Sequence, residues 1–475
     1  MYPQFESDKA LVKIHPSPRQ LAVQEMEFYA FAHFTVNTFT DREWGDGSEA
    51  ESVFNPTAFD AAQWVDALRS AGIRGLLLTC KHHDGFCLWP SAYTEHSVKN
   101  SPFRGGKGDV VREVSDACRR GGLKFGVYLS PWDRNSQLYG QGKPYDDYFC
   151  QQLRELCTGY GELFSVWFDG ACGEGPNGKR QVYDWERYYA LIRSLQPNAA
   201  IAISGPDIRW CGNEAGDTRE SEWSVLPTGF ASPEKVAAHS QRDDDPAFRE
   251  KRIDETQRDL GSRAFLSGAI GYQWSPAETD TSIRPGWFYH AFEDGRVRST
   301  EELLDIWYRT VGGNSTLLLN IPPDRRGLFH ETDVARLREL GEVLRRTFAC
   351  NLALHAEIAS DRDDGYHTAE NVREDSYDSY FKPFDGENTA VLTLRWPESQ
   401  TISNVVIKEN IQMGQRVERF VIEARTADGH FAECARGTTI GYKKIARIGS
   451  VRTDMLRICI TDSRVAPVIS FVGVY

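Results

Sequence analysis

The sequence predicts an α/β protein, in which a (β/α)8 barrel of the TIM type over residues 1–350 precedes an all-β sandwich over residues 351–475. In the first part of the chain, short apolar runs alternate with amphipathic stretches at intervals of roughly 40 residues, a spacing typical of repeated βα units. After Leu352 the helical patterns stop, and short strand-like runs separated by polar turns continue to the end.

The first half of the barrel follows from apolar runs that end in polar residues or glycine. These predict strands at Phe28–Val36, Gly75–Thr79, Lys124–Leu129, Leu163–Phe168 and Ala199–Ser204. Between them, apolar residues at helical spacing predict helices at Thr57–Ala71, Asp109–Arg120, Tyr145–Tyr160 and Tyr183–Leu195. Gly121-Gly122 and Pro197, which follow the second and the last of these helices, are typical of helix ends.

The second half of the barrel has a weaker pattern. We interpret residues 206–300 as long barrel loops that contain one further strand, at Ala264–Tyr272. A helix at Glu301–Val311, a strand at Thr316–Ile321 and a closing helix at Thr332–Arg346 complete the domain. An open doubly wound sheet is the alternative, but no GxGxxG turn follows the first strand. The sandwich strands are expected at Val391–Trp396, Asn404–Ile407, Phe420–Ala424, Leu456–Thr461 and Val468–Val474.

The composition narrows the function classes. A net charge of −13 argues against a nucleic-acid partner, and no apolar run approaches the length of a membrane span. No signal-peptide pattern is visible at the N-terminus, and the 10 cysteines are scattered without CxxC pairs, so we expect reduced thiols and a cytoplasmic location. Aromatic residues make up 12% of the chain, which fits a large core or a site that stacks sugars. The sequence leaves the oligomeric state open.

Polar residues follow the predicted strands at corresponding places. His33 lies near the end of the first strand, Lys81-His82-His83-Asp84-Gly85 follows the second, and Tyr128 ends the third. Asp169 follows the fourth strand and Glu214 follows the fifth. Because the carboxyl ends of the strands meet at one face of a barrel, we expect these side chains to share a pocket.

Asp169 occupies the most informative position. In Val166-Trp167-Phe168-Asp169-Gly170-Ala171 an apolar run breaks into glycine directly after a carboxylate. At a barrel mouth such a carboxylate suits nucleophilic catalysis on a sugar. The alternative is a structural role, in which Asp169 caps a helix or forms an Asx turn.

The partner carboxylate remains open between three residues. Glycoside hydrolysis needs a second carboxyl group as proton donor, and Glu214 is our candidate. Glu220 and Glu222 lie in the same loop and are rivals that sequence alone does not separate. The structural alternative for Glu214 is a solvated loop residue.

The His82-His83-Asp84 block admits a metal interpretation, since imidazoles and a carboxylate can bind Zn²⁺. Adjacent residues on an extended segment point to opposite sides, however, and no HExxH or spaced Cys/His set accompanies them. We expect these histidines to bind substrate hydroxyl groups, with structurally satisfied histidines as the alternative.

Taken together, these motifs resemble the α-L-fucosidases of glycoside hydrolase family 29, over most of residues 20–350 and in the downstream β region. The residues that carry the resemblance are His33, Glu43-Trp44, Lys81-His82-His83-Asp84-Gly85-Phe86, Gly126-Val127-Tyr128, Trp167-Phe168-Asp169-Gly170 and Asn314-Ser315-Thr316-Leu317-Leu318-Leu319-Asn320-Ile321-Pro322-Pro323.

The resemblance implies a retaining exo-α-L-fucosidase with Asp169 as nucleophile and Glu214 as acid/base. From the residues themselves we expect neither a metal nor a cofactor. The loop around Glu214 is similar to that of the branch acting on α-1,3/1,4-linked, Lewis-type oligosaccharides. The residues expected to bind fucose are His33, Glu43, Trp44, His82, His83, Tyr128, Trp167 and Trp287.

Other functions stay open at this point. The alternatives are another retaining barrel glycosidase, a transfucosidase, a non-catalytic sugar-binding protein and a metal-dependent hydrolase that uses His82, His83 and Asp84. The methyl group of fucose needs an apolar wall, for which we expect Phe34, Trp167 or Trp287. The C-terminal sandwich either binds carbohydrate or supports the barrel.

Overall fold

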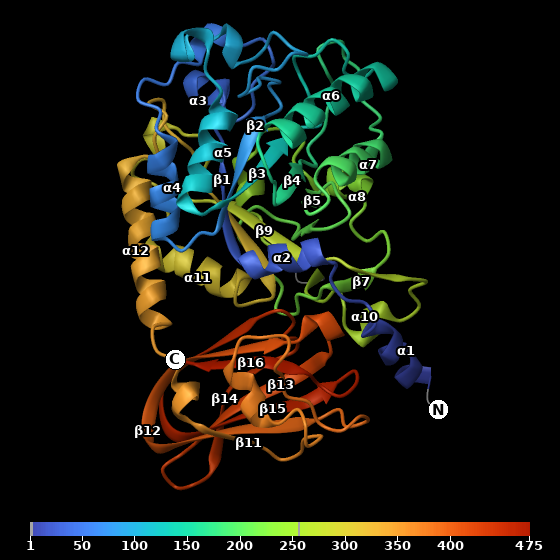
Figure 1. Ribbon diagram of the computed structural model, residues 1–475, viewed down its shortest axis with the longest axis vertical. Coiled ribbons are helices and arrows are strands. Elements are labelled where there is room, and N and C mark those ends of the chain that lie inside the picture. Colours follow the sequence, from blue (N-terminus) through green and yellow to red (C-terminus); the bar gives the residue numbers. More distant parts are fainter. Residues whose placement is uncertain (1–2, 255–256) are drawn as a thin grey trace.

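The computed structural model describes residues 3–254 and 257–475 and shows two stacked parts (Figure 1). Residues 1–2 and 255–256, which fall in the predicted N-terminal and loop segments, lie outside the described residues. An eight-stranded parallel sheet surrounded by helices forms the first part, and an antiparallel β-domain forms the second. The predicted fold class is therefore confirmed.

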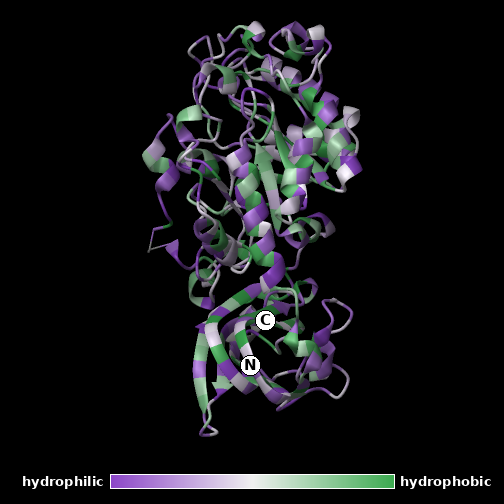
Figure 2. Cartoon of the chain, turned by 90° about the vertical axis from the view of Figure 1, so that its left-hand side faces the viewer, coloured by the Kyte–Doolittle hydropathy of each residue, from purple (hydrophilic) through white to green (hydrophobic). Residues whose placement is uncertain are grey.

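The barrel sheet has the order β5-β4-β3-β2-β1-β10-β9-β6. A bridge between Ala202 and Ile208 joins β5 to the segment before β6 and nearly closes the ring. The strands are buried along almost their whole length, and Figure 2 shows the hydrophobic centre of this part. Their bounds are β1 Phe28–Ala32, β2 Gly75–Lys81, β3 Lys124–Leu129, β4 Ser165–Phe168, β5 Ala200–Ile203, β6 Arg209–Trp210, β9 Ala277–Ser282 and β10 Ser315–Asn320.

The outer helices are the predicted ones, displaced by a few residues at their ends. Side chains at the N-caps fix several starts: Asp60, Asp109 and Asp184 each accept a backbone N–H of the following turn. Within the described residues, no helix is long and apolar enough to cross a bilayer. The outer helices are α4 Ala61–Ser70, α5 Val110–Gly121, α6 Lys143–Gly159, α7 Trp185–Leu195, α11 Thr300–Thr310 and α12 Glu331–Thr347.

Shorter helices precede the barrel or lie in its loops. The helix α2 contacts β5 and β10, and its start carries a capping box formed by Ser17 and Gln20. The bounds of these helices are α1 Pro3–Leu11, α2 Pro18–Met26, α3 Val36–Thr40, α8 Pro233–His239, α9 Pro246–Glu250 and α10 Arg263–Leu266.

The strand predicted at Ala264–Tyr272 is wrong. Most of α10 occupies its first residues, and its last residue begins β8 Tyr272–Trp274, which pairs outside the barrel with β7 Val225–Pro227. The seventh barrel strand is instead β9, whose sequence Ala-Glu-Thr-Asp-Thr-Ser is buried at every position. The apolar pattern misses β9 because its polar side chains face partners inside the barrel rather than water. The first strand is also shorter than predicted and ends at Ala32.

The C-terminal domain is one antiparallel system in the order β11-β12-β15-β13-β14, with β16 paired to β12. The runs predicted as separate strands at Val391–Trp396 and Asn404–Ile407 are parts of β12, in which register shifts interrupt the pairing with β15. The strands are β11 Glu357–Ser360, β12 Ala390–Glu409, β13 Val417–Arg425, β14 Phe431–Gly437, β15 Lys444–Ser463 and β16 Ile469–Val474.

The β-domain packs against the end of the barrel where the strands begin. Glu27, directly before β1, accepts hydrogen bonds from Tyr442 (2.9 Å) and Lys443 (2.8 Å) of the β-domain. Although burial alone would raise it, the charges of Lys443 and Lys408 lower the pKa of Glu27 to about 2. This buried ionic contact links the two domains on the side opposite to the strand ends.

We expect Glu27→Gln to lower the free energy of unfolding at pH 7 by about 3 kcal/mol, the equivalent of its depressed pKa. A depressed carboxyl pKa adds stability above the unfolded value near 4.5, and this stability is lost as the pH falls toward 2. Urea titrations at pH 7 and at pH 3 measure the difference, with Glu162→Gln at an exposed site as control. Equal destabilisation at both pH values would contradict the ionic role.

Candidate active site

A pocket opens where the barrel strands end, and it gathers most of the side chains predicted from the sequence. His33 follows β1, and His82 and His83 follow β2. Trp167 lies near the end of β4, and Asp169 directly follows that strand. Tyr128 is not part of the pocket wall but reaches Asp169 from β3. The predicted residues on the wall are His33, Glu43, Trp44, His82, His83, Trp167, Asp169, Glu214 and Trp287.

The two carboxylate oxygens of Asp169 have different surroundings: one accepts a backbone N–H group, and the other faces the pocket. Its Oδ1 accepts the N–H of Ala171 at 2.8 Å, which is the Asx turn of the structural alternative. Its Oδ2 accepts the hydroxyl of Tyr128 at 3.0 Å. Burial raises the pKa of Asp169, and the hydrogen bonds from Ala171, Tyr128 and Gly170 act against it. The turn therefore orients the carboxylate while these donors favour its ionised form.

His33 presents an acceptor nitrogen to the pocket. Its Nδ1 lies 2.8 Å from Oδ1 of Asn320, whose amide nitrogen donates to the carbonyl of Trp287. The oxygen of Asn320 must therefore face His33, so Nδ1 carries the hydrogen and Nε2 is left as an acceptor. Burial lowers the pKa of His33 to about 3, which keeps the ring neutral. A neutral acceptor suits a sugar hydroxyl group.

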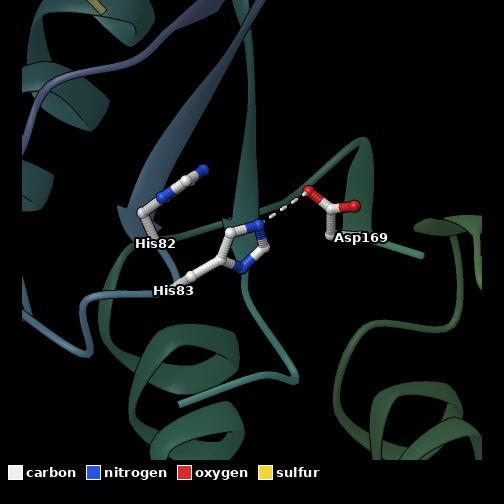
Figure 3. A group of neighbouring side chains, drawn as sticks. All are labelled: His82, His83 and Asp169. Carbon is white, nitrogen blue, oxygen red and sulfur yellow. Dashed lines mark ion pairs between the residues drawn. The ribbon is translucent and has the colours of Figure 1, made fainter. Parts of the chain in front are cut away.

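His82 and His83 lie side by side on the pocket wall (Figure 3). Their ring centroids are 4.1 Å apart, so the expectation that adjacent histidines point to opposite sides is wrong. The chain leaves its extended form at His83 and turns, which brings both rings to one face. Asp84 does not join them: it is buried elsewhere and accepts hydrogen bonds from Thr35 and Phe86.

His83 faces the nucleophile candidate as a neutral ring, across the contact that Figure 3 marks with a dashed line. Its Nδ1 donates to Ser130, whose hydroxyl in turn donates to the carbonyl of Trp132. Its Nε2 is then an acceptor 3.7 Å from Oδ2 of Asp169. Burial lowers the pKa of His83 to about 3 and lowers the pKa of His82 well below its ordinary value, so both rings are neutral. The acceptor nitrogens on this wall need hydrogen-bond donors, and the hydroxyl groups of a substrate can supply them.

These side chains also contain the donor set of a cation site. One ligand atom each from His82, His83 and Asp169 lie within 4.8 Å of one another. Neutral imidazoles and a carboxylate are chemically suitable for Zn²⁺, so the metal alternative moves from Asp84 to Asp169.

Glu214 differs from Asp169 in how its oxygens are used. Its Oε2 accepts two N–H groups, from Gln241 at 2.7 Å and from the indole of Trp287 at 2.9 Å. Burial raises the pKa of Glu214 to about 7, and the two hydrogen bonds act against that rise. A carboxyl group with such a pKa can hold a proton near neutral pH and give it up again. Glu214 follows β6, the sixth strand, rather than the fifth as predicted.

The two rival glutamates do not line the pocket. Glu222 is fully buried between Arg209 and Arg219, whose charges lower its pKa although burial would raise it. Glu220 is exposed and borders a separate surface cleft. Geometry therefore selects Glu214 as the second carboxyl group of the pocket.

Glu43 and Trp44 lie on the wall between the pocket and a wider cleft. Both Glu43 oxygens are occupied: they accept the backbone N–H groups of Trp287 and Phe288 and a hydrogen bond from His290. Although burial opposes it, Glu43 raises the pKa of His290, with help from Asp41, to about 9. Glu43 thus also holds the loop of Trp287. Trp44 packs edge-on against His83 at 5.3 Å.

Several pocket residues were not predicted. Phe31, Trp210, Gln241 and Asp280 line the wall, and the indole N–H of Trp210 donates to Asp280 at 2.8 Å. Burial raises the pKa of Asp280 well above its ordinary value. Only the period-2 alternation of polar residues in β9 could have indicated Asp280, since Gln241 lies in an unpatterned loop.

Two further positions complete the apolar side of the pocket. Phe34, expected as a wall for the fucose methyl group, packs in the core against Phe54 and Trp64 instead. Phe31 takes its place and meets Trp167 edge-on at 4.9 Å.

A parallel barrel that presents two half-buried carboxyl groups, neutral histidines and aromatic walls at its strand ends defines the class of protein: it is a glycoside hydrolase. The profile of the family described as Alpha-L-fucosidase matches residues 17–347, so the chain belongs to that family, glycoside hydrolase family 29. It is an α-L-fucosidase by activity class.

Known relatives cover almost the whole chain. Alpha-L-fucosidase 1 of Arabidopsis thaliana is 39% identical over 99% of this chain and 91% of its own length. The crystal structure of a putative alpha-L-fucosidase from Bacteroides ovatus has a TM-score of 0.86 at 45% identity, over 100% of this chain and 76% of that chain. A Ruminococcus gnavus GH29 fucosidase in complex with fucose has a TM-score of 0.82 at 30% identity, over 97% of this chain and 95% of that one.

The different surroundings of the rival glutamates give a stability prediction. We expect Glu222→Gln to lower the free energy of unfolding by about 3–5 kcal/mol, because it leaves two buried arginines without their carboxylate. Glu220→Gln, the same change at the exposed neighbour, should shift the unfolding midpoint very little. Denaturant titration of both variants checks this. Similar midpoints for the two variants would mean that Glu222 is not buried as described.

Proposed function

We propose that the protein is a retaining exo-α-L-fucosidase that releases L-fucose from α-1,3/1,4-linked, Lewis-type oligosaccharides by double displacement. The observation that carries the proposal is that two carboxyl groups on one pocket wall differ in their hydrogen-bond donors and in their pKa. Asp169 has donors on both oxygens, whereas burial places the pKa of Glu214 at about 7. One group is suited to attack and the other to proton transfer.

In the first step, Oδ2 of Asp169 attacks the anomeric carbon. The turn at Ala171 fixes the orientation of the carboxylate. The hydroxyl of Tyr128 donates a hydrogen bond to Oδ2, the same oxygen that attacks the carbon. Glu214 gives its proton to the leaving oxygen at the same time, so that no free alkoxide forms. The products are a fucosyl ester on Asp169, a released alcohol and an ionised Glu214.

In the second step, the ionised Glu214 removes a proton from water, and the water oxygen attacks the anomeric carbon from the face opposite Asp169. The bond between that carbon and Oδ2 breaks, which releases Asp169 as a carboxylate. Fucose leaves with its original anomeric configuration, and Glu214 regains its proton. The neutral rings of His33, His82 and His83 bind the hydroxyl groups of fucose, and Phe31, Trp167 and Trp287 provide apolar surface for its methyl group. The fucose complex of the R. gnavus relative supports this ligand.

The cleft beyond Trp44 is the evidence in favour of a branched aglycone. It begins at Glu43 and Trp44, and its wall includes Phe292, a residue that is 68% exposed and whose ring stacks on His290. An exposed ring next to the fucose pocket suits the apolar face of a neighbouring sugar. The similarity of the Glu214 loop to the α-1,3/1,4 branch of the family points to the same substrates.

Azide separates the roles of the two carboxyl groups. We expect Asp169→Ala to lose at least about 1,000-fold in kcat on 4-nitrophenyl α-L-fucoside, and azide to restore turnover as β-fucosyl azide. Glu214→Ala should still form the ester from this activated substrate, and azide should give α-fucosyl azide. Product NMR distinguishes the two anomers.

Two outcomes would contradict the assignment. Near-normal turnover by Asp169→Ala would remove it as nucleophile, and azide rescue of Glu220→Ala would move the acid/base role there. The assays are run with and without EDTA. Loss of activity with EDTA would instead support the metal-dependent alternative built on His82, His83 and Asp169.

A panel of Lewis a, Lewis x, H-type and core-fucosylated glycans tests the linkage. We expect release of fucose from Lewis a and Lewis x at rates at least about 10-fold above the other two, because only branched substrates fill the cleft beyond Trp44. Mass spectrometry of the products measures this, and larger fucosylated products would reveal transfucosylation. Equal cleavage of all four glycans would contradict the branched specificity.

A further inference from the structure

We propose that Gln241 is a positioning residue for the proton donor: together with Trp287 it occupies Oε2 of Glu214 and so holds the acid proton on Oε1. The helix α9 holds both of these donors in place. This inference rests on the proposed acid/base role of Glu214 and adds to it the residue that determines which oxygen works as the acid.

The first step is the geometry at Oε2. Gln241 Nε2 lies 2.7 Å and Trp287 Nε1 lies 2.9 Å from this oxygen. An indole nitrogen can only donate, and the amide nitrogen of glutamine can only donate as well. An oxygen that accepts two N–H groups is the unprotonated oxygen of a carboxyl group. The proton of Glu214 therefore belongs on Oε1.

The second step is the orientation of the Gln241 amide. Its Oε1 accepts the backbone N–H of Asp245 at 3.2 Å, so its nitrogen is the end that faces Glu214. Gln241 is 7% exposed as a residue, which leaves little water to compete for either end of its amide. Gln241 thus acts as a fixed donor rather than as an amide free to turn.

The third step is the role of α9 (Pro246–Glu250). Asp245 is its N-cap, so the N–H that fixes Gln241 belongs to the start of this helix. Arg249, one turn later, pairs with Asp244 at 2.6 Å and donates to the carbonyl of Pro285 at 3.0 Å. Pro285 lies two residues before Trp287. One short helix therefore ties down both N–H donors of Glu214.

The fourth step is the consequence for catalysis. Transfer of the proton leaves Glu214 as a carboxylate, and the two N–H groups stabilise that product. The other charged or ionisable groups near Glu214 are Asp169, Asp280 and Arg249. A sugar alcohol is a poor leaving group and needs the proton, whereas 2,4-dinitrophenolate leaves without it. Loss of Gln241 should therefore slow the reaction only of substrates whose leaving group must be protonated.

The experiment compares Gln241→Leu with the unaltered enzyme on two substrates, 2,4-dinitrophenyl α-L-fucoside and Lewis x trisaccharide. Loss of one hydrogen bond to a charged acceptor should lower kcat/KM for the trisaccharide by about 10- to 100-fold, and for the aryl fucoside by less than about 3-fold. Removing a donor that favours the carboxylate raises the pKa of Glu214, so the alkaline limb of the kcat/KM profile should move to higher pH.

Two control variants keep the test decisive. Gln141→Leu, the same change at an exposed glutamine, should leave kcat/KM unchanged for both substrates. Glu214→Ala should show the same substrate selectivity with a larger loss, and if it does not, the proposed function itself fails. If Gln241→Leu does not fold, Gln241→Met, which keeps the length of the side chain but removes its amide, should give the selective loss instead.

A selective loss on the trisaccharide, with the pH shift, supports the positioning role. Equal losses on both substrates, with an unchanged alkaline limb, would overturn it and reduce Gln241 to a structural residue of the loop.

Discussion

Burying a carboxyl group is costly unless donors surround it, and this constraint organises the inside of the barrel and the pocket at its strand ends. Asp169, Glu214, Glu278 and Asp280 all lose water there, and burial raises the pKa of each. What distinguishes them is the number and direction of their donors. Asp169 has a backbone turn on one oxygen and a phenol on the other, while Glu214 concentrates its donors on a single oxygen.

The same dehydration explains the rest of the wall. Histidines in this setting stay neutral, and Asn320 and Ser130 fix their hydrogens on the side away from the substrate. Aromatic residues serve as donors as well as walls, since the indole of Trp167 reaches Glu278 at 2.7 Å and that of Trp210 reaches Asp280. The β-domain contributes no residue to the pocket among the described residues; it is anchored at the other end of the barrel through Glu27.

Much of this could be predicted from the sequence. The apolar runs of β1 to β5 and β10 have no competing interpretation, and polar residues directly after them mark the pocket, which is why His33, His83 and Asp169 were found. The strand β9 was missed because its inward side chains are polar and find partners in the barrel. Gln241 carries no local signal, since its role depends on a loop returning over the pocket. Glu214 could be separated from Glu222 only once the arginines around Glu222 were seen in space.

Trapping the covalent intermediate tests the division of roles among these carboxyl groups most directly. A 2-deoxy-2-fluoro-α-L-fucosyl fluoride slows the second displacement more than the loss of fluoride, so the ester accumulates. Peptide mass spectrometry after digestion then locates the sugar. We expect one fluorofucosyl group, attached to Asp169. Attachment to Glu214 or Asp280, or the absence of any adduct during turnover, would contradict the assignment of Asp169 as the nucleophile.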